Sequence, residues 1–173
     1  MSILIGLHEV NPPIFLAPMA GITDLPFRRV VSRFKTGHFV SEMIASQELL
    51  TQRPGVRQKA ALGTNAANTS VQISGRDPYA ISETAKLVEG MGAQIIDINM
   101  GCPAKKVVNG YAGSALLKDL DLAARLIEAV VTSVSVPVTL KTRLGWNDTN
   151  FNAPKLAKIA EQVGIKLITI HAR

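Results

Sequence analysis

Short apolar runs alternate with helix-periodic segments along the chain, and this alternation constrains the fold more than any other feature of the sequence. In the helix-periodic segments apolar residues recur three and four positions apart, most clearly between residues 123 and 134. Asp24, followed by Pro26, is expected to cap the first helix. Six apolar runs are predicted as strands: residues 14–17, 39–40, 71–73, 95–98, 138–140 and 167–170. Strands that alternate with helices predict a parallel α/β sheet, buried on both faces.

The number of predicted strands indicates a barrel that is incomplete in this chain. A (β/α)8 barrel needs eight strand–helix units and typically about 250 residues. The chain has 173 residues and stops directly after its sixth predicted strand. We therefore expect an α/β fold, a TIM (β/α)8 barrel truncated after about six strands. Residues 1–173 would form one partial barrel domain that lacks at least two βα units.

The composition is that of a well-folded intracellular protein. Apolar residues make up 47% of the chain, which is enough for a sizeable core and argues against disorder. The net charge of +6 favours a polyanionic partner such as RNA, although many cytosolic enzymes are as basic. A single cysteine allows no intrachain disulfide and fits a reducing compartment. We recognise no signal peptide or transmembrane span, so we expect a cytoplasmic protein with no membrane contact.

Polar and reactive residues end or follow all six predicted strands. The active site of a βα barrel forms at the carboxyl ends of its strands, so these residues would converge on one rim. No single one of them is specific, but together they are hard to explain by packing alone. In chain order they are Pro18–Gly21, Ser41–Met43, Gln72, Asn99–Pro103, Lys141–Arg143 and His171–Arg173.

The segment Asn99–Pro103 carries the most information about chemistry. Gly101 permits a tight turn and the close approach of a ligand, and Pro103 stiffens the backbone after the cysteine. Cys102 is therefore presented on a loop at a strand end. A free cysteine is most often a small buried hydrophobe, but the Gly-Cys-Pro context at a strand end favours a reactive thiol here.

Lys141 and Arg143 are two residues apart on one strand, so their side chains share a face. Charge near the interior of a sheet is costly unless it meets an anion, such as a flavin or a phosphate. A pair of solvated rim charges is an equally open interpretation.

His171 ends an apolar strand and is a candidate site residue. The alternative is a structural histidine of the core that is hydrogen-bonded to a backbone carbonyl. His38 is expected to be structural, and Glu42 either binds a ligand hydroxyl or faces solvent.

These residues occur in the order and spacing of a known family. The chain resembles the tRNA-dihydrouridine synthases, and within them the bacterial B-type enzymes, over essentially its whole length. The run Asn-Met-Gly-Cys-Pro-Ala-Lys-Lys-Val is the most specific part of the resemblance. The segments that carry it are Ala17–Asp24, Ser41–Met43, Val71–Ile73, Asp97–Pro103, Gly113–Leu117, Leu140–Arg143 and Thr169–His171.

The resemblance implies an FMN-binding TIM barrel followed by a small helical tRNA-binding domain. Asn99 and Arg143 would hold the target uracil or nearby RNA. Lys141 would lie near the N1 and O2 edge of the flavin, where a cation stabilises the anionic reduced form. The residues implied to bind the cofactor are Pro18, Met19, Ala20, Gln72, Lys141 and His171.

The implied reaction is the reduction of uridines in tRNA to 5,6-dihydrouridine. NADPH would reduce FMN, a hydride would pass to C6 of the uracil ring, and Cys102 would protonate C5. The resemblance implies tRNA as partner, no metal, and a monomer when the protein is intact. One departure is Ala172, where the family usually has glycine. Two alternatives stay open: another FMN barrel of the dihydroorotate dehydrogenase type, and an inactive RNA-binding fragment.

Overall fold

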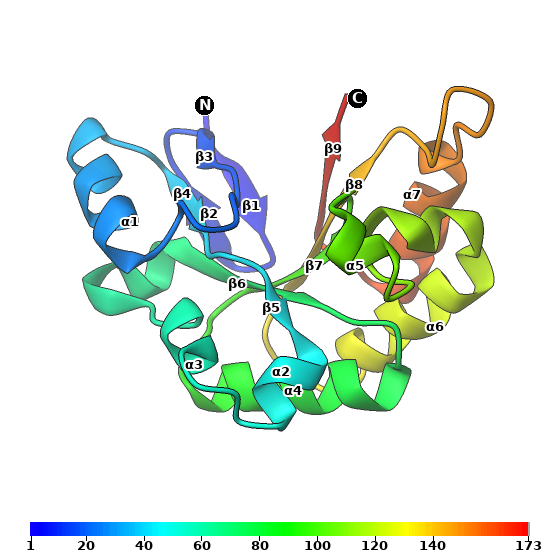
Figure 1. Cartoon of the computed structure of the whole chain (residues 1–173). Coiled ribbons are helices and arrows are strands. Elements are labelled where there is room, and N and C mark those ends of the chain that lie inside the picture. The colour runs from blue at the N-terminus through cyan, green and yellow to red at the C-terminus, as the bar shows by residue number, and fades with distance from the viewer. Residues whose placement is uncertain (173) are drawn as a thin grey trace.

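One curved parallel sheet forms the centre of the computed structural model, which describes residues 1–172 except for the side chains of residues 64–66 (Figure 1). The strands are β3 (Phe15–Leu16), β4 (His38–Val40), β5 (Ile44–Ala45), β6 (Thr69–Ser74), β7 (Ile96–Met100), β8 (Val138–Arg143) and β9 (Leu167–His171). Neighbouring strands follow the order β3-β4-β6-β7-β8-β9, and β5 pairs with the second half of β6. All of these pairings are parallel, as the alternation of strands and helices predicts.

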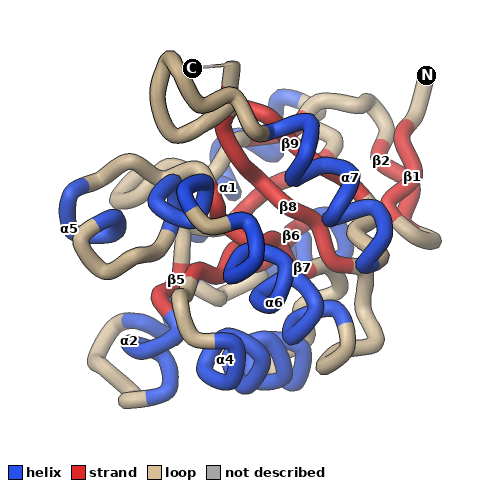
Figure 2. The backbone as a smooth tube through the Cα atoms, turned by 90° about the vertical axis from the view of Figure 1, so that its right-hand side faces the viewer, coloured by secondary structure: helices blue, strands red, loops and turns tan. Residues whose placement is uncertain are grey.

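Helices connect the strands, and the three longest of them cover the outer, convex side of the sheet. The helices are α1 (Leu25–Val31), α2 (Ser46–Leu50), α3 (Val56–Lys59), α4 (Pro78–Gly90), α5 (Lys105–Val108), α6 (Leu120–Val131) and α7 (Ala153–Val163), with 3₁₀ turns η1 (Ser32–Phe34), η2 (Gly63–Asn68) and η3 (Gly113–Lys118). Figure 2 shows α4, α6 and α7 side by side, with α6 in contact with both neighbours. Aspartates cap three of the seven helices in the described residues. Asp24, Asp77 and Asp119 accept backbone N–H groups at the starts of α1, α4 and α6.

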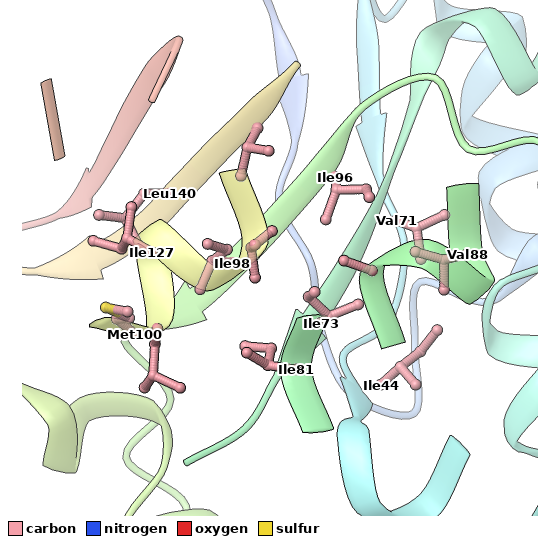
Figure 3. Close-up of a cluster of buried hydrophobic side chains, with 14 of the residues drawn as sticks. Ile44, Val71, Ile73, Ile81, Val88, Ile96, Ile98, Met100, Ile127 and Leu140 are labelled. Carbon is pink, nitrogen blue, oxygen red and sulfur yellow. The ribbon is translucent and has the colours of Figure 1, made fainter. Parts of the chain in front are cut away.

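The main core lies between the sheet and these helices. Ile73 and Ile98 point outward from β6 and β7 and pack against Ile81 of α4 and Ile127 of α6 (Figure 3). All four side chains are fully buried. Removing a side chain of this size from water contributes about 1.5–3 kcal/mol to stability. The helical spacing of the apolar residues in α4 and α6 is therefore explained by their packing against the sheet.

An N-terminal hairpin, which the sequence pattern does not predict, precedes the barrel strands. Its strands are β1 (Ile3–Ile5) and β2 (His8–Val10), joined by a turn that starts at Gly6 with a φ of 61°. Ile5 and Val10 bury their side chains with Ile95, and Leu167 packs against this cluster. Because Ile95 and Leu167 lie at the starts of β7 and β9, the hairpin covers the amino-terminal end of the sheet.

The expectation of a partial TIM barrel is confirmed, since the curved sheet and its outer helices form part of such a barrel. Burial on both faces holds for β6 and β7, whereas β9 is the edge strand of the described sheet and is partly exposed. The glycine-containing segment after Cys102 contains α5 and η3. None of the helices in residues 1–172 combines the length and the apolar character needed to cross a membrane.

Candidate active site

The two-residue period of a strand separates an apolar outer face of the sheet from a polar inner face. Val71 and Ile73 pack toward the helices, so Gln72 between them points inward. The same alternation operates on β7 and β8. The parallel register then aligns the inner residues across the sheet in the pairs Gln72–Asp97, Asp97–Thr139, Asn99–Lys141, Lys141–Thr169 and Arg143–His171.

A cavity of about 230 Å³ opens on this inner face at the carboxyl ends of the strands. It brings together every residue that the sequence predicts for the site except Met19. Met43, Gly101 and Pro103 complete its wall. The predicted residues in the lining are Pro18, Ala20, Gln72, Asn99, Cys102, Lys141, Arg143 and His171.

Met19 lies outside this lining, and its backbone groups are engaged in a turn. Its N–H donates to the Thr23 hydroxyl at 3.0 Å. Its carbonyl accepts the N–H groups of Ile22 and Thr23, both at 3.0 Å. The turn presents Pro18 and Ala20 to the cavity, and a flavin contact by Met19 stays a prediction.

The Cys102 loop is held from three sides. Asn99 Oδ1 accepts the N–H groups of Gly101 at 3.2 Å and Cys102 at 3.0 Å. The Cys102 carbonyl accepts the N–H of Ser114 at 3.0 Å. Arg143 Nε donates to the Gly101 carbonyl at 2.8 Å. Cys102 itself is partly exposed and lines the cavity, so its thiol is accessible to a ligand.

Two glycines allow this close approach of backbone segments. A Cβ at Gly101 would lie 3.1 Å from the carbonyl carbon of Thr142. A Cβ at Gly113, whose φ is +60°, would lie 2.5 Å from the Cys102 carbonyl oxygen. The glycines that the sequence places around Cys102 therefore permit its loop to pack on β8 and on η3.

A continuous hydrogen-bond chain runs beneath the cavity. The Thr139 hydroxyl donates to Asp97 Oδ1 at 2.6 Å, and Gln72 Nε2 donates to Asp97 Oδ2 at 2.7 Å. Asn99 Nδ2 then donates to Gln72 Oε1 at 3.0 Å. Because Asn99 also caps the Cys102 loop, the chain links a buried carboxylate on β7 to the partly exposed cysteine.

Positive charge faces the cavity from β8. Burial lowers the pKa of Lys141, the nearby Asp97 carboxylate opposes this shift, and Arg143 adds to it. Burial raises the pKa of Asp97, and this rise is opposed by hydrogen bonds from Thr139 and Gln72 and by Lys141. An anionic edge of a ligand in the cavity would therefore be stabilised by both cations.

The cavity wall is shaped by a break between β4 and β5, which lie end to end along β6. At this break Ser41 Oγ accepts the N–H of Gln72 at 3.0 Å, in place of a backbone carbonyl. Met43, in the segment between the two strands, lines the cavity. Glu42, for which ligand binding and solvent exposure were both open, accepts the N–H of Gly21 and joins the first and second strand ends.

A second, larger hollow of about 660 Å³ adjoins the cavity. The two share Ala20, Met43 and Cys102 in their linings, so the cysteine lies at their junction. We call this second hollow the outer groove. Its charged lining residues are Glu48, Lys59, Arg76 and Lys106.

The sequence does not predict a site role for Asp97, and it places Ser41 on the rim without predicting its contact; only Asp97 has a readable signal. Asp97 is an acidic residue between isoleucines in a buried strand, which requires a partner. The role of Ser41 depends on its contact with Gln72, which no local pattern encodes. Within the described part of the chain, no three His, Cys, Asp or Glu side chains are grouped to hold a metal ion.

Several known proteins resemble this chain. The chain is 56% identical over its whole length to a probable tRNA-dihydrouridine synthase of Rhodobacter capsulatus, covering 54% of that protein. It is 53% identical to a probable tRNA-dihydrouridine synthase of Rickettsia conorii, covering 99% of this chain and 52% of that one. It is 48% identical over its whole length to tRNA-dihydrouridine synthase B of Pseudomonas aeruginosa, covering 52% of that protein.

The chain thus spans about half the length of the curated relatives it matches. The family model described as dihydrouridine synthase matches residues 15–173, which include every strand of the curved sheet and every residue of the cavity lining. The chain belongs to the dihydrouridine synthase family.

Proposed function

We propose that this chain contributes the catalytic face of an FMN-dependent enzyme that reduces uridines of tRNA to 5,6-dihydrouridine. The observation that carries the proposal is the convergence, in a chain of this family, of Cys102 and the polar residues of β6, β7 and β8 on one cavity. The family match gives no support to the dihydroorotate dehydrogenase alternative. With tRNA as substrate, the proposed compartment is the cytoplasm.

FMN fits the cavity by the chemistry of its lining. Pro18 and Ala20 offer an apolar surface, and Gln72 and His171 offer hydrogen bonds. Lys141 offers the cation that an electron-rich flavin edge requires. When bound, FMN would supply to C6 of the uracil ring a hydride that originates from NADPH.

The chain's own residues then complete the reduction of the C5–C6 double bond. Cys102 donates its thiol proton to C5, and the thiolate regains a proton from solvent. Hydride and proton together balance the two electrons and two hydrogens that the ring gains. Arg143 uses Nε on the Gly101 carbonyl, which leaves its terminal nitrogens for the uracil oxygens. Asn99 keeps the second hydrogen of Nδ2 for the same ring.

The outer groove supports a polynucleotide substrate. A uridine that enters the cavity must leave its stack, which costs a few kcal/mol, and its neighbours in the RNA must lie outside. Lys59, Arg76 and Lys106 line the groove that meets the cavity at Cys102, and they contribute to the net charge of +6. These side chains are proposed to contact RNA phosphates.

The proposal is tested with the purified full-length protein, NADPH and unmodified tRNA. We expect flavin absorbance in the purified protein and dihydrouridine in the nucleosides released from the tRNA, measured by mass spectrometry. The same reaction without NADPH is the control. A flavin-loaded protein that forms no dihydrouridine on any tRNA would contradict the proposal.

A further inference from the structure

Asp97 lies beneath the cavity and reaches it only through other side chains. It is 4% exposed, at the second position of β7, where a carboxylate is costly unless its oxygens have donors. Thr139 and Gln72 supply those donors. On the basis of the proposed function, in which Cys102 is the proton donor, we propose that Asp97 is a positioning residue. Its carboxylate fixes the direction of a hydrogen-bond relay that holds the Cys102 loop.

The relay has a direction because each amide can be turned either way. The oxygen and nitrogen of an amide are nearly equal in shape, so hydrogen-bond partners decide its orientation. Ionised Asp97 can only accept, so Gln72 turns Nε2 toward it and Oε1 toward Asn99. Asn99 must then donate to Gln72, which leaves its Oδ1 for the N–H groups of Gly101 and Cys102.

Both ends of the relay demand this same direction. The backbone N–H of Cys102 can only donate, so the loop requires an oxygen from Asn99. The carboxylate of Asp97 requires a donor from Gln72. Lys141 helps to keep Asp97 ionised, since its positive charge opposes the rise in the Asp97 pKa that burial causes. A fully satisfied buried network of this kind specifies one geometry, whereas a partly satisfied one is costly.

Asn99→Asp tests the direction because it changes a donor into an acceptor at constant size. The new carboxylate can still accept from the Cys102 loop, but its second oxygen faces Gln72 Oε1. Turning the Gln72 amide removes that contact and places Oε1 against Asp97 instead. As long as both carboxyl groups are ionised, one acceptor–acceptor contact therefore stays in the relay wherever it is placed.

Adding Asp97→Asn removes the conflict by reversing the relay. The new amide at position 97 accepts from Thr139 and donates to the turned Gln72 Oε1. Gln72 Nε2 then donates to the carboxylate at position 99, which still caps the Cys102 loop. Every group regains a partner, so the exchange of the two side chains is predicted to rescue what Asn99→Asp alone disrupts.

The measurement is the alkylation rate of Cys102 by iodoacetamide in the full-length protein, quantified on the peptide that contains it, together with the urea midpoint. We expect alkylation about tenfold faster in Asn99→Asp, within the range of roughly 5- to 150-fold that an unmade buried hydrogen bond costs. The midpoint should fall as well. The double variant Asp97→Asn/Asn99→Asp should return to within about twofold of the wild-type rate, since its hydrogen bonds are again complete.

The matched control is Thr139→Val combined with Asn99→Asp. Thr139→Val removes a hydrogen-bond partner of Asp97 without supplying a donor to Gln72, so this double variant should keep the alkylation rate and the urea midpoint of Asn99→Asp. A double variant Asp97→Asn/Asn99→Asp that is as reactive or as unstable as Asn99→Asp alone would overturn the relay. Wild-type behaviour of Asn99→Asp alone would overturn it equally. If Asn99→Asp does not fold, recovery of folded double variant is the supporting result. Neither readout requires tRNA, so failure of the relay is distinguishable from failure of the proposed function.

Discussion

Replacing His38 is predicted to remove part of the loss of folding free energy that acid causes between pH 7 and pH 4. His38 begins β4 and is 2% exposed, with Nε2 at 2.7 Å from the Ser70 hydroxyl and its ring against Phe15. Burial lowers the pKa of His38 to about 4, and the nearby His8 adds to the shift. His38→Gln cannot titrate in this range and can still hydrogen-bond to Ser70.

The sign and size of the effect follow from linkage. In the unfolded chain the His38 imidazole is protonated near pH 6.5, whereas in the folded protein it is protonated only near pH 4. The stability that depends on neutral His38 is therefore fully present above pH 6.5 and is lost as the pH falls to 4. A shift of this size corresponds to about 3 kcal/mol. The free energy of unfolding of the wild type relative to His38→Gln should therefore fall by about 3 kcal/mol between pH 7 and pH 4.

Urea denaturation at pH 7, 6, 5 and 4, followed by the fluorescence of Trp146, measures this difference. The carboxylates that also titrate in this range are common to both proteins and cancel in the comparison. Ser70→Ala is the control, because it removes the hydrogen bond but keeps His38 buried, and the pH dependence should persist. Stability profiles of wild type and His38→Gln that stay parallel from pH 7 to pH 4 would refute the reasoning.

Two further substitutions test the site. Gly113→Ala should destabilise the protein by about 1–3 kcal/mol, because the φ of Gly113 is +60° and the new Cβ would meet the Cys102 carbonyl at 2.5 Å. Thermal unfolding and the rate of tRNA reduction measure the effect, and an unchanged melting temperature would count against the prediction. Lys141→Gln should weaken FMN binding about tenfold or more, since a hydrogen bond from a charged donor is lost. Titration of the apoprotein with FMN measures the dissociation constant, and an unchanged value would remove Lys141 from the proposed cofactor contacts.

The alternation of strands and helices could be predicted from the sequence because burial imposes its periodicity on each element. The apolar residues of β6 and β7 mark the outer face, and their strand ends place Gln72, Asn99 and Cys102 on one rim. The short strands β1 and β2 could not be predicted from such periodicity, since each has three residues. Their stability comes from burial against Ile95, a contact distant in sequence.

The site was predicted as a set of residues but not as a network. That Cys102 and Lys141 meet in one cavity follows from strand-end positions in a βα barrel. That Asp97 supports Asn99 through Gln72 depends on the register of β6 against β7, which the sequence does not state. The direction of a hydrogen bond between side chains is a tertiary property, and only the structure reveals it.

The most direct test of the account is the rate of uridine reduction by Cys102→Ala in the full-length protein. Unmodified tRNA and NADPH are supplied, and the wild type is compared at equal flavin content, so that loss of cofactor cannot explain the result. We predict a rate lower by about 100-fold or more, the usual contribution of a positioned general acid. Reduction at the wild-type rate would contradict the assignment of Cys102 as the proton donor to C5.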